Sequence, residues 1–203
     1  AALLNRLGKS DGDPIYDTDW IPQLHFDNRG ISNLAGLEMF SSLGFSLNYL
    51  DLSANDITDV GPLSGLTRLE RLYLSDNNID DVGPLSGLSN VWKLDLSGNN
   101  IIDLGPLSGL PRLSYLDVRG NPLDEEALSV QIPALQAKGV KVNRDPREVK
   151  IPDANLRIAL TEHLGKSEGD PIYDTEGIGD LHFDNRGISN LAGLEMLTNL
   201  YYL

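Results

Sequence analysis

The sequence contains no cysteine, so thiol catalysis, disulfide bonds and cysteine-ligated metals are excluded. It has no run of about 18 apolar residues, so no segment is expected to insert into a membrane. Basic residues are also scarce, with 16 Lys and Arg against 30 Asp and Glu and a net charge of −14. Because nucleic-acid affinity comes largely from clustered basic side chains, this balance argues against a nucleic-acid partner.

Motifs for catalysis are missing as well. The three histidines, His25, His163 and His182, include no pair with the spacing of zinc ligands. No glycine-rich phosphate loop follows a predicted strand, and a Ser/His/Asp set would have to be assembled from scattered positions. We therefore predict a protein that is not an enzyme and that has no cofactor and no metal.

Two acidic clusters offer carboxylates of the kind that bind calcium. They comprise Asp11, Asp13, Asp17 and Asp19, and then Glu168, Asp170, Asp174 and Glu176. Calcium takes six to eight oxygen ligands, which carboxylates on a loop can supply. The spacing is not that of an EF-hand, however, and Pro14 interrupts the first cluster. We interpret both clusters as loops and caps after a helix, and calcium binding as the alternative.

What the sequence does contain is a repeat of 22 residues. The segments Leu50–Leu52, Leu72–Leu74, Leu94–Leu96 and Leu116–Val118 follow one another at this spacing, and Asn55, Asn77, Asn99 and Asn121 recur at the same offset. The connecting segment that begins at Asp59 returns almost unchanged at Asp81 and Asp103. Such an exact period indicates a solenoid of stacked coils.

Each repeat predicts one short strand followed by a compact return. Alternation in Leu-x-x-Leu-x-Leu places every second side chain in the core. In one coil the expected core residues are Leu69, Leu72, Leu74, Ile79, Val82, Leu85 and Leu88. The asparagine side chain is expected to turn inward and bond to backbone groups where the chain leaves the strand. The repeated Gly-Pro pair prevents a long helix on the return, so 3₁₀ or other short turns are expected there.

These motifs resemble the leucine-rich-repeat family, specifically the 22-residue type of protein-phosphatase regulators and bacterial internalin-like proteins. The resemblance covers residues 21–123 and again 178–203. It implies an α/β fold: a right-handed leucine-rich-repeat solenoid with a parallel β-sheet on the concave side, 3₁₀ or short turns on the convex side, and helical caps. It also leans towards a bacterial protein at the cell surface or outside the cell.

The ends of the array depart from the pattern. The spacing from Leu24 to Leu50 is 26 residues, which places a four-residue insertion within Phe40–Ser46. Residues 158–196 match residues 1–39 at 30 of 39 positions, which predicts tandem modules. We expect a truncated N-terminal helical cap (1–20), leucine-rich repeats (21–123), a C-terminal flanking helix and strand (124–146), a second N-terminal cap (147–180) and the start of a second, incomplete array (181–203).

The outward strand positions form columns on the concave face. One column holds Gln23, Tyr49, Arg71, Lys93 and Tyr115, the next holds His25, Asp51, Tyr73, Asp95 and Asp117, and a third holds Asp27, Ser53, Ser75, Ser97 and Arg119. Trp92 is expected beside them at the edge of its strand. Tyr, Trp and Arg dominate the energetics of protein interfaces. From the first two columns and their edge we select as partner-binding residues Tyr49, Arg71, Tyr73, Trp92, Lys93, Asp95, Tyr115, Asp117, Asp51 and His25.

These residues predict a non-catalytic module that binds a protein through its concave face. Packing between neighbouring coils is an alternative explanation of the tyrosines, and the aspartates have two further explanations, solubility or pairing with Arg71 and Lys93. Two other functions stay open. One is a structural or adhesive spacer at a cell surface that self-associates through the open C-terminal end of the solenoid. The other is carbohydrate binding by aromatic stacking.

Overall fold

The structure is a computed structural model that describes residues 22–42, 46–174, 179–197 and 200–202. The chain divides into two compact units, residues 1–144 and 145–203. The expected N-terminal cap, residues 1–20, lies outside the described residues. None of the helices in the described ranges has the length and apolar character needed to cross a membrane.

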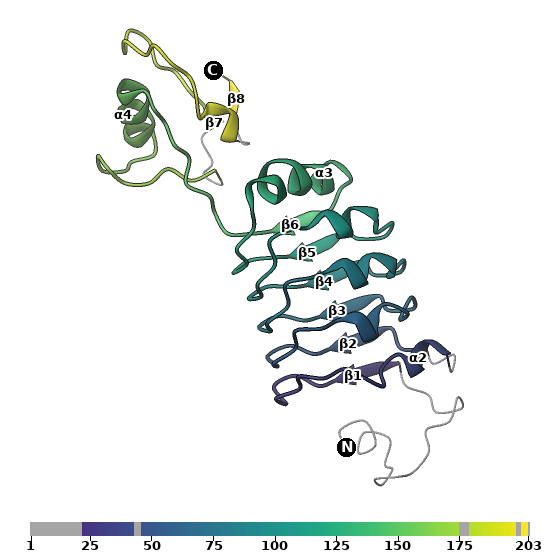
Figure 1. Cartoon of the computed structure of the whole chain (residues 1–203). Helices are drawn as coiled ribbons and strands as arrows, with labels where there is room; N and C mark the ends of the chain where they lie inside the picture. The colour runs from purple at the N-terminus through teal and green to yellow at the C-terminus, as the bar shows by residue number, and fades with distance from the viewer. Residues whose placement is uncertain (1–21, 43–45, 175–178, 198–199, 203) are drawn as a thin grey trace. The chain divides into compact units, whose positions relative to one another are not determined.

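The first unit is a stack of coils built on one parallel sheet (Figure 1). Its six strands pair in sequence order, and the central leucines Leu24, Leu50, Leu72, Leu94 and Leu116 occupy one register column that ends in Val142. The strands are β1 (Gln23–His25), β2 (Tyr49–Asp51), β3 (Arg71–Tyr73), β4 (Lys93–Asp95), β5 (Tyr115–Asp117) and β6 (Lys141–Asn143). The predicted leucine-rich-repeat solenoid is thereby confirmed.

The core lies between the strands and the returning turns. All seven residues expected in the coil that starts at Leu69 are at most 1% exposed. Each aliphatic side chain buried in this way contributes roughly 1.5–3 kcal/mol. A single coil has no second layer of its own, so this burial depends on the coils above and below it.

The inward asparagines are hydrogen-bonded to two coils at once. Asn77 donates through Nδ2 to the carbonyls of Leu52 and Leu74, both at 3.0 Å, and accepts from the N–H of Ile57 at 3.0 Å. Asn55 serves the first coil, which has Arg29 in place of asparagine: its Oδ1 accepts from the backbone N–H of Arg29 and of Ile31. The predicted inward role of these amides is confirmed.

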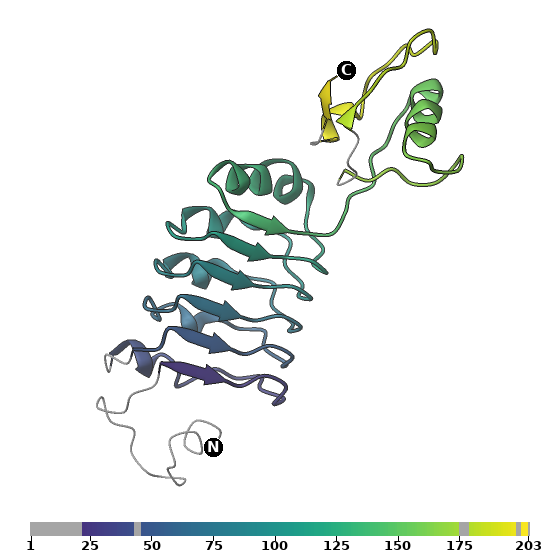
Figure 2. The same cartoon turned by 180° about the vertical axis from the view of Figure 1, so that it is seen from behind.

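The convex side consists of short turns, which lie opposite the strand arrows in Figure 1 and Figure 2. Three coils return through the 3₁₀ helices η1 (Gly61–Leu63), η2 (Gly83–Gly87) and η3 (Gly105–Gly109), each with Pro in its first turn. Asp59, Asp81 and Asp103 each accept a hydrogen bond from the glycine N–H two residues later, which fixes the start of these turns. The first coil differs, because its longer return holds the short α-helix α2 (Met39–Ser42).

The C-terminal flank of this unit covers the last coil. The sequence predicts one helix from Asp124 to about Lys138, but residues Ala127–Gln131 form a π-helical turn, η4, before the α-helix α3 (Ile132–Ala137). Pro133 accounts for the difference, since it lacks an N–H and its ring would clash with the carbonyl four residues earlier in a regular α-helix. Gln131 joins the flank to the last coil, because its Oε1 accepts from the N–H of Leu104 and its Nε2 donates to Asp103.

The second unit begins with a helix and a short sheet. It contains α4 (Ala154–His163), β7 (Gly179–Asp180), the 3₁₀ helix η5 (Leu194–Met196) and β8 (Leu200–Tyr202), which pairs in parallel with β7. Asp153 caps α4 by accepting from the N–H of Leu156, and its other oxygen accepts from the N–H groups of Ser189 and Asn190. These hydrogen bonds to backbone and side-chain donors lower the pKa of Asp153 to about 2.

The acidic loop of the second unit is held by hydrogen bonds to the backbone. Asp170 accepts from the N–H of Ser167, and Asp174, which is buried, accepts from the N–H of Arg147. Among the described residues of this loop, no three acidic groups gather as a metal cluster. The matching cluster at residues 11–19, together with Glu176, lies outside the described residues, so the calcium alternative stays a sequence-based hypothesis there.

Candidate functional site

The concave face presents two columns of side chains in the expected register. The first strand position gives Gln23, Tyr49, Arg71, Lys93, Tyr115 and Lys141, and the third gives His25, Asp51, Tyr73, Asp95, Asp117 and Asn143. These side chains all leave the sheet on the side opposite the leucine core, because successive strand residues alternate between faces. The sequence therefore predicted which residues share this wall.

The aromatic and basic residues of this wall contact one another in a continuous series, which we call the aromatic–cation ladder: His25, Tyr49, Arg71, Tyr73, Lys93 and Tyr115. The ring of Tyr49 lies 4.7 Å from that of His25 and 5.3 Å from that of Tyr73, centroid to centroid. Both contacts are diagonal, joining a third strand position to a first position on a neighbouring strand. Diagonal neighbours in a sheet are within reach of aromatic side chains.

Cations complete the series by lying over tyrosine rings. The guanidinium carbon of Arg71 is 5.1 Å from the ring centre of Tyr49, and Lys93 Nζ is 5.2 Å from that of Tyr73 and 5.1 Å from that of Tyr115. Each cation–ring contact of this kind contributes about 0.5–1 kcal/mol at an exposed site. The ladder thus spans five strands and holds its long side chains in defined positions before any partner arrives.

The surroundings of Tyr49 change the acidity of its hydroxyl. Partial burial raises the pKa of its hydroxyl, and the carboxylate of Asp51 raises it further, whereas the positive charge of Arg71 opposes both. The phenol therefore stays protonated and able to donate a hydrogen bond across the physiological pH range.

The aspartates of the third strand position bond to their own backbone. Asp51, Asp95 and Asp117 each accept through Oδ1 from the N–H two residues further on, at 3.0, 3.1 and 3.2 Å. This explains why Asp recurs at the end of the strand, where the chain turns away from the sheet. The sequence offered solubility or pairing with Arg71 and Lys93 as explanations, and backbone bonding was not among them.

Asp117 is the most constrained of the three, with 1% of its surface exposed. Its carboxylate accepts from the guanidinium of Arg119, with Oδ2 2.6 Å from Nη2, and from Asn143 Nδ2 at 3.2 Å. Burial raises the pKa of Asp117, but the hydrogen bonds from Arg119 and Asn143 outweigh it and hold the pKa below its usual value. Asp117 therefore remains ionised and paired, and offers less to a partner than the sequence suggested.

Trp92 lies at the margin of the wall, as expected. It directly precedes β4 and is 40% exposed. Its N–H donates to the carbonyl of Glu70 in one neighbouring coil, and its carbonyl accepts from the N–H of Tyr115 in the other. Sequence reasoning missed Lys141 and Asn143, which add a sixth row through β6. The sequence predicts a strand at Val140-Lys141-Val142, and its alternation was the signal that pointed Lys141 outward. Asn143 lies one residue beyond that predicted strand.

Comparisons with known proteins agree with this architecture. The model of the leucine-rich-repeat family, in its two-copy form, matches residues 46–90 and 89–129. No curated protein sequence matched the chain. Residues 46–129 are therefore leucine-rich repeats, and the fold of the chain is similar to that of an internalin.

Of two matching solved structures, the first carries the similarity in fold. An internalin (inlF) from Listeria monocytogenes is 24% identical with a TM-score of 0.58, and the match covers 99% of this chain and 53% of that one. Internalin C2 (inlC2) from the same species is 22% identical with a TM-score of 0.41, and the match covers 71% of this chain and 91% of that one. The chain thus spans about half the length of the first of these proteins.

Proposed function

We propose that this chain is a non-catalytic module that binds another protein through the aromatic–cation ladder of its concave face. The observation that carries the proposal is the unbroken series of ring and cation contacts from His25 to Tyr115. Leucine-rich repeats and an internalin-like fold support a protein-interaction module in general, and the ladder supplies the residue types that dominate interface energetics.

The preorganisation of the ladder favours binding. Tyr49, Tyr73 and Tyr115 are half-buried, and their rings already contact neighbouring residues of the ladder. Ordering a flexible side chain at an interface costs about 0.5–1.5 kcal/mol, and that cost is reduced when the side chain is held in place beforehand. Tyrosine adds a large apolar surface with a hydroxyl that forms hydrogen bonds.

The same geometry disfavours binding of sugars by stacking. A sugar ring stacks on the open face of an aromatic ring, but a cation lies over each of the three ladder tyrosines. Carbohydrate binding would have to displace Arg71 and Lys93 from those faces. A glycan array probed with the whole chain tests this alternative, and specific glycan capture that is lost on Tyr73→Ala would favour it over protein binding.

The structural or adhesive spacer is the other alternative. It rests on the recurrence of residues 1–39 at 158–196, from which the sequence predicts tandem modules. Light scattering of the chain over a range of concentrations separates the two functions. A concentration-dependent rise in mass that is unchanged by ladder substitutions supports self-association, whereas a constant monomer mass supports binding of a different protein.

The proposal is tested with binders selected from a displayed library of folded proteins on the unmodified chain. For a binder that uses the ladder, Tyr73→Ala combined with Tyr115→Ala should weaken affinity at least about tenfold, because the few central residues that dominate an interface, often tyrosines, cost about 2 kcal/mol or more when truncated. Ile102→Ala, which changes a side chain that is 52% exposed on the segment between β4 and η3, is the matched control. If most binders tolerate the double variant as well as the control, the ladder is not the preferred binding surface.

A further inference from the structure

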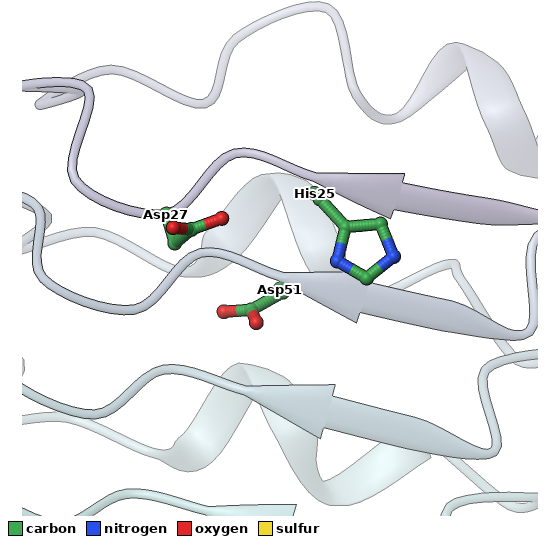
Figure 3. Close-up of side chains that lie close together, drawn as sticks. All are labelled: His25, Asp27 and Asp51. Carbon is green, nitrogen blue, oxygen red and sulfur yellow. The ribbon is translucent and has the colours of Figure 1, made fainter.

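Three side chains that commonly bind metals meet at the β1 end of the concave face. His25 on β1, Asp27 just after it and Asp51 on β2 each offer one ligand atom, and these atoms all lie within 4.8 Å of one another (Figure 3). His25 and Asp51 are direct neighbours in the register of the parallel pair. His25 and Asp27 are two residues apart and project from the same face. The repeat architecture itself therefore brings the three groups together.

Two of these side chains are held in place by their neighbours. The imidazole of His25 lies against the ring of Tyr49, with centroids 4.7 Å apart. The Oδ1 atom of Asp51 accepts from the N–H of Ser53 at 3.0 Å, which holds the carboxylate in place and leaves Oδ2 to bind a metal ion. Asp27 is exposed and can adjust its position. Such preorganisation lowers the entropic cost of closing a site around an ion.

We infer that His25, Asp27 and Asp51 form a binding site for a divalent transition metal of the zinc type. Zinc accepts imidazole nitrogen at about 2.0–2.1 Å and carboxylate oxygen at about 2.0–2.2 Å, and sites with three protein ligands keep a fourth position for water. Ligand atoms around a tetrahedral zinc ion at these distances are roughly 3.4 Å apart. Side-chain rotations that move the ligand atoms by about 1 Å therefore bring the three close enough to bind one ion. Two carboxylates on a chain with a net charge of −14 also attract cations.

The mixed ligand set selects against calcium. Calcium takes six to eight oxygen ligands, whereas the two aspartates offer at most four and one of those is bonded to Ser53. Imidazole is a ligand for zinc, copper, iron and nickel rather than for calcium or magnesium. Spacing along the sequence gave no sign of this site, because its ligands come from two neighbouring strands and include one histidine only.

The second unit provides a matched comparison. His182 and Asp184 repeat the pair His25 and Asp27 at the same two-residue spacing. Among the described residues, these two are not part of a group of three metal-binding side chains. Because a third ligand is what distinguishes the first site, we expect His182 to contribute little to metal affinity.

Titration calorimetry of the metal-stripped full chain with zinc chloride tests the inference, with calcium chloride as the comparison. We expect one site that binds zinc more tightly than calcium. His25→Ala, Asp27→Asn and Asp51→Asn should each weaken it at least about tenfold, since even the loss of an outer-shell partner costs 10–100-fold. In Asp51→Asn the side-chain oxygen can still accept from the N–H of Ser53, so this variant tests the metal ligand and not the turn. His182→Ala should leave the affinity unchanged.

Three results would overturn the inference: no saturable zinc binding by the native chain, zinc affinity that survives His25→Ala, or calcium bound more tightly than zinc. Circular dichroism of each variant establishes that it folds. Binding of a protein partner to the ladder is measured separately in the presence of a chelator, so a failure of this inference does not affect the proposed function.

Discussion

Replacing Asn77 with alanine should destabilise the first unit strongly although it removes only a small side chain. Asn77 is 7% exposed and forms buried hydrogen bonds with three backbone groups. After truncation, the N–H of Ile57 loses its side-chain acceptor inside the core. An unsatisfied buried donor of this kind costs about 1–3 kcal/mol.

The two carbonyls lose less, because each accepts from two asparagines. The carbonyl of Leu52 keeps its bond from Asn55, and that of Leu74 keeps its bond from Asn99. Each lost bond therefore counts only its net contribution of about 0.5–1.5 kcal/mol. In total, the free energy of unfolding should fall by roughly 2–6 kcal/mol.

Urea denaturation followed by circular dichroism measures this loss. Asn78→Ala is the control, because Asn78 is exposed and surface substitutions usually change stability by less than about 0.5 kcal/mol. Asn77→Asp should be at least as harmful as Asn77→Ala, since it turns a carboxylate oxygen towards the carbonyls that Nδ2 now serves. If Asn77→Ala and Asn78→Ala unfold at the same urea concentration, the asparagines do not join the coils as described.

Three further predictions concern the acids and a glycine. Because the pKa of Asp117 is lowered, its stabilising contribution is complete above about pH 4 and is lost as the pH falls below that value. When the free energy of unfolding is measured against pH, Asp117→Asn should flatten the acid part of the profile, and an unchanged profile would contradict the lowered pKa of Asp117. Asp153→Ala should lower the melting temperature of the second unit at pH 7, and its difference in melting temperature from the native chain should shrink near pH 2, where the native carboxyl also becomes protonated. An equal difference at both pH values would argue that Asp153 does not cap α4. Gly193→Ala should lower the melting temperature more than Gly169→Ala, since both glycines have a φ between 95° and 98° but, of the two, only Gly193 would bring a Cβ against backbone, with Lys150 O 2.6 Å away. The left-handed conformation alone costs about 1–2 kcal/mol at either position, so equal losses would show that the structure shifts to relieve the contact with Lys150.

Much of the first unit could be predicted because one period fixes many positions at once. A spacing of 22 residues defines the strands, the inward leucines, the asparagine bonds and the columns of the concave face, and the structure places these as expected. The departures occur where the period stops. The π-helical turn before α3 follows from Pro133, and α2 replaces a 3₁₀ turn in the longer first coil.

Contacts within the wall were harder to foresee. The register of the strands shows which residues are neighbours in a column. Whether a cation contacts a tyrosine of its own column or of the next one depends on side-chain rotamers, which the register does not determine. The bonds from the aspartates to backbone N–H groups are local and competed with the more obvious pairing to Arg71 and Lys93. The gathering of His25, Asp27 and Asp51 depends on a pair of strands whose spacing of 26 residues departs from the repeat.

The most direct measurement of the central claim is site-specific photo-crosslinking to a selected protein binder. A photoreactive phenylalanine analogue is placed at position 73, within the ladder, or at position 102, outside the concave face and exposed in the native chain. We predict efficient crosslinking from position 73 and little from position 102. Equal crosslinking from both positions, or stronger crosslinking from position 102, would contradict the claim that the aromatic–cation ladder is where this chain meets its partner.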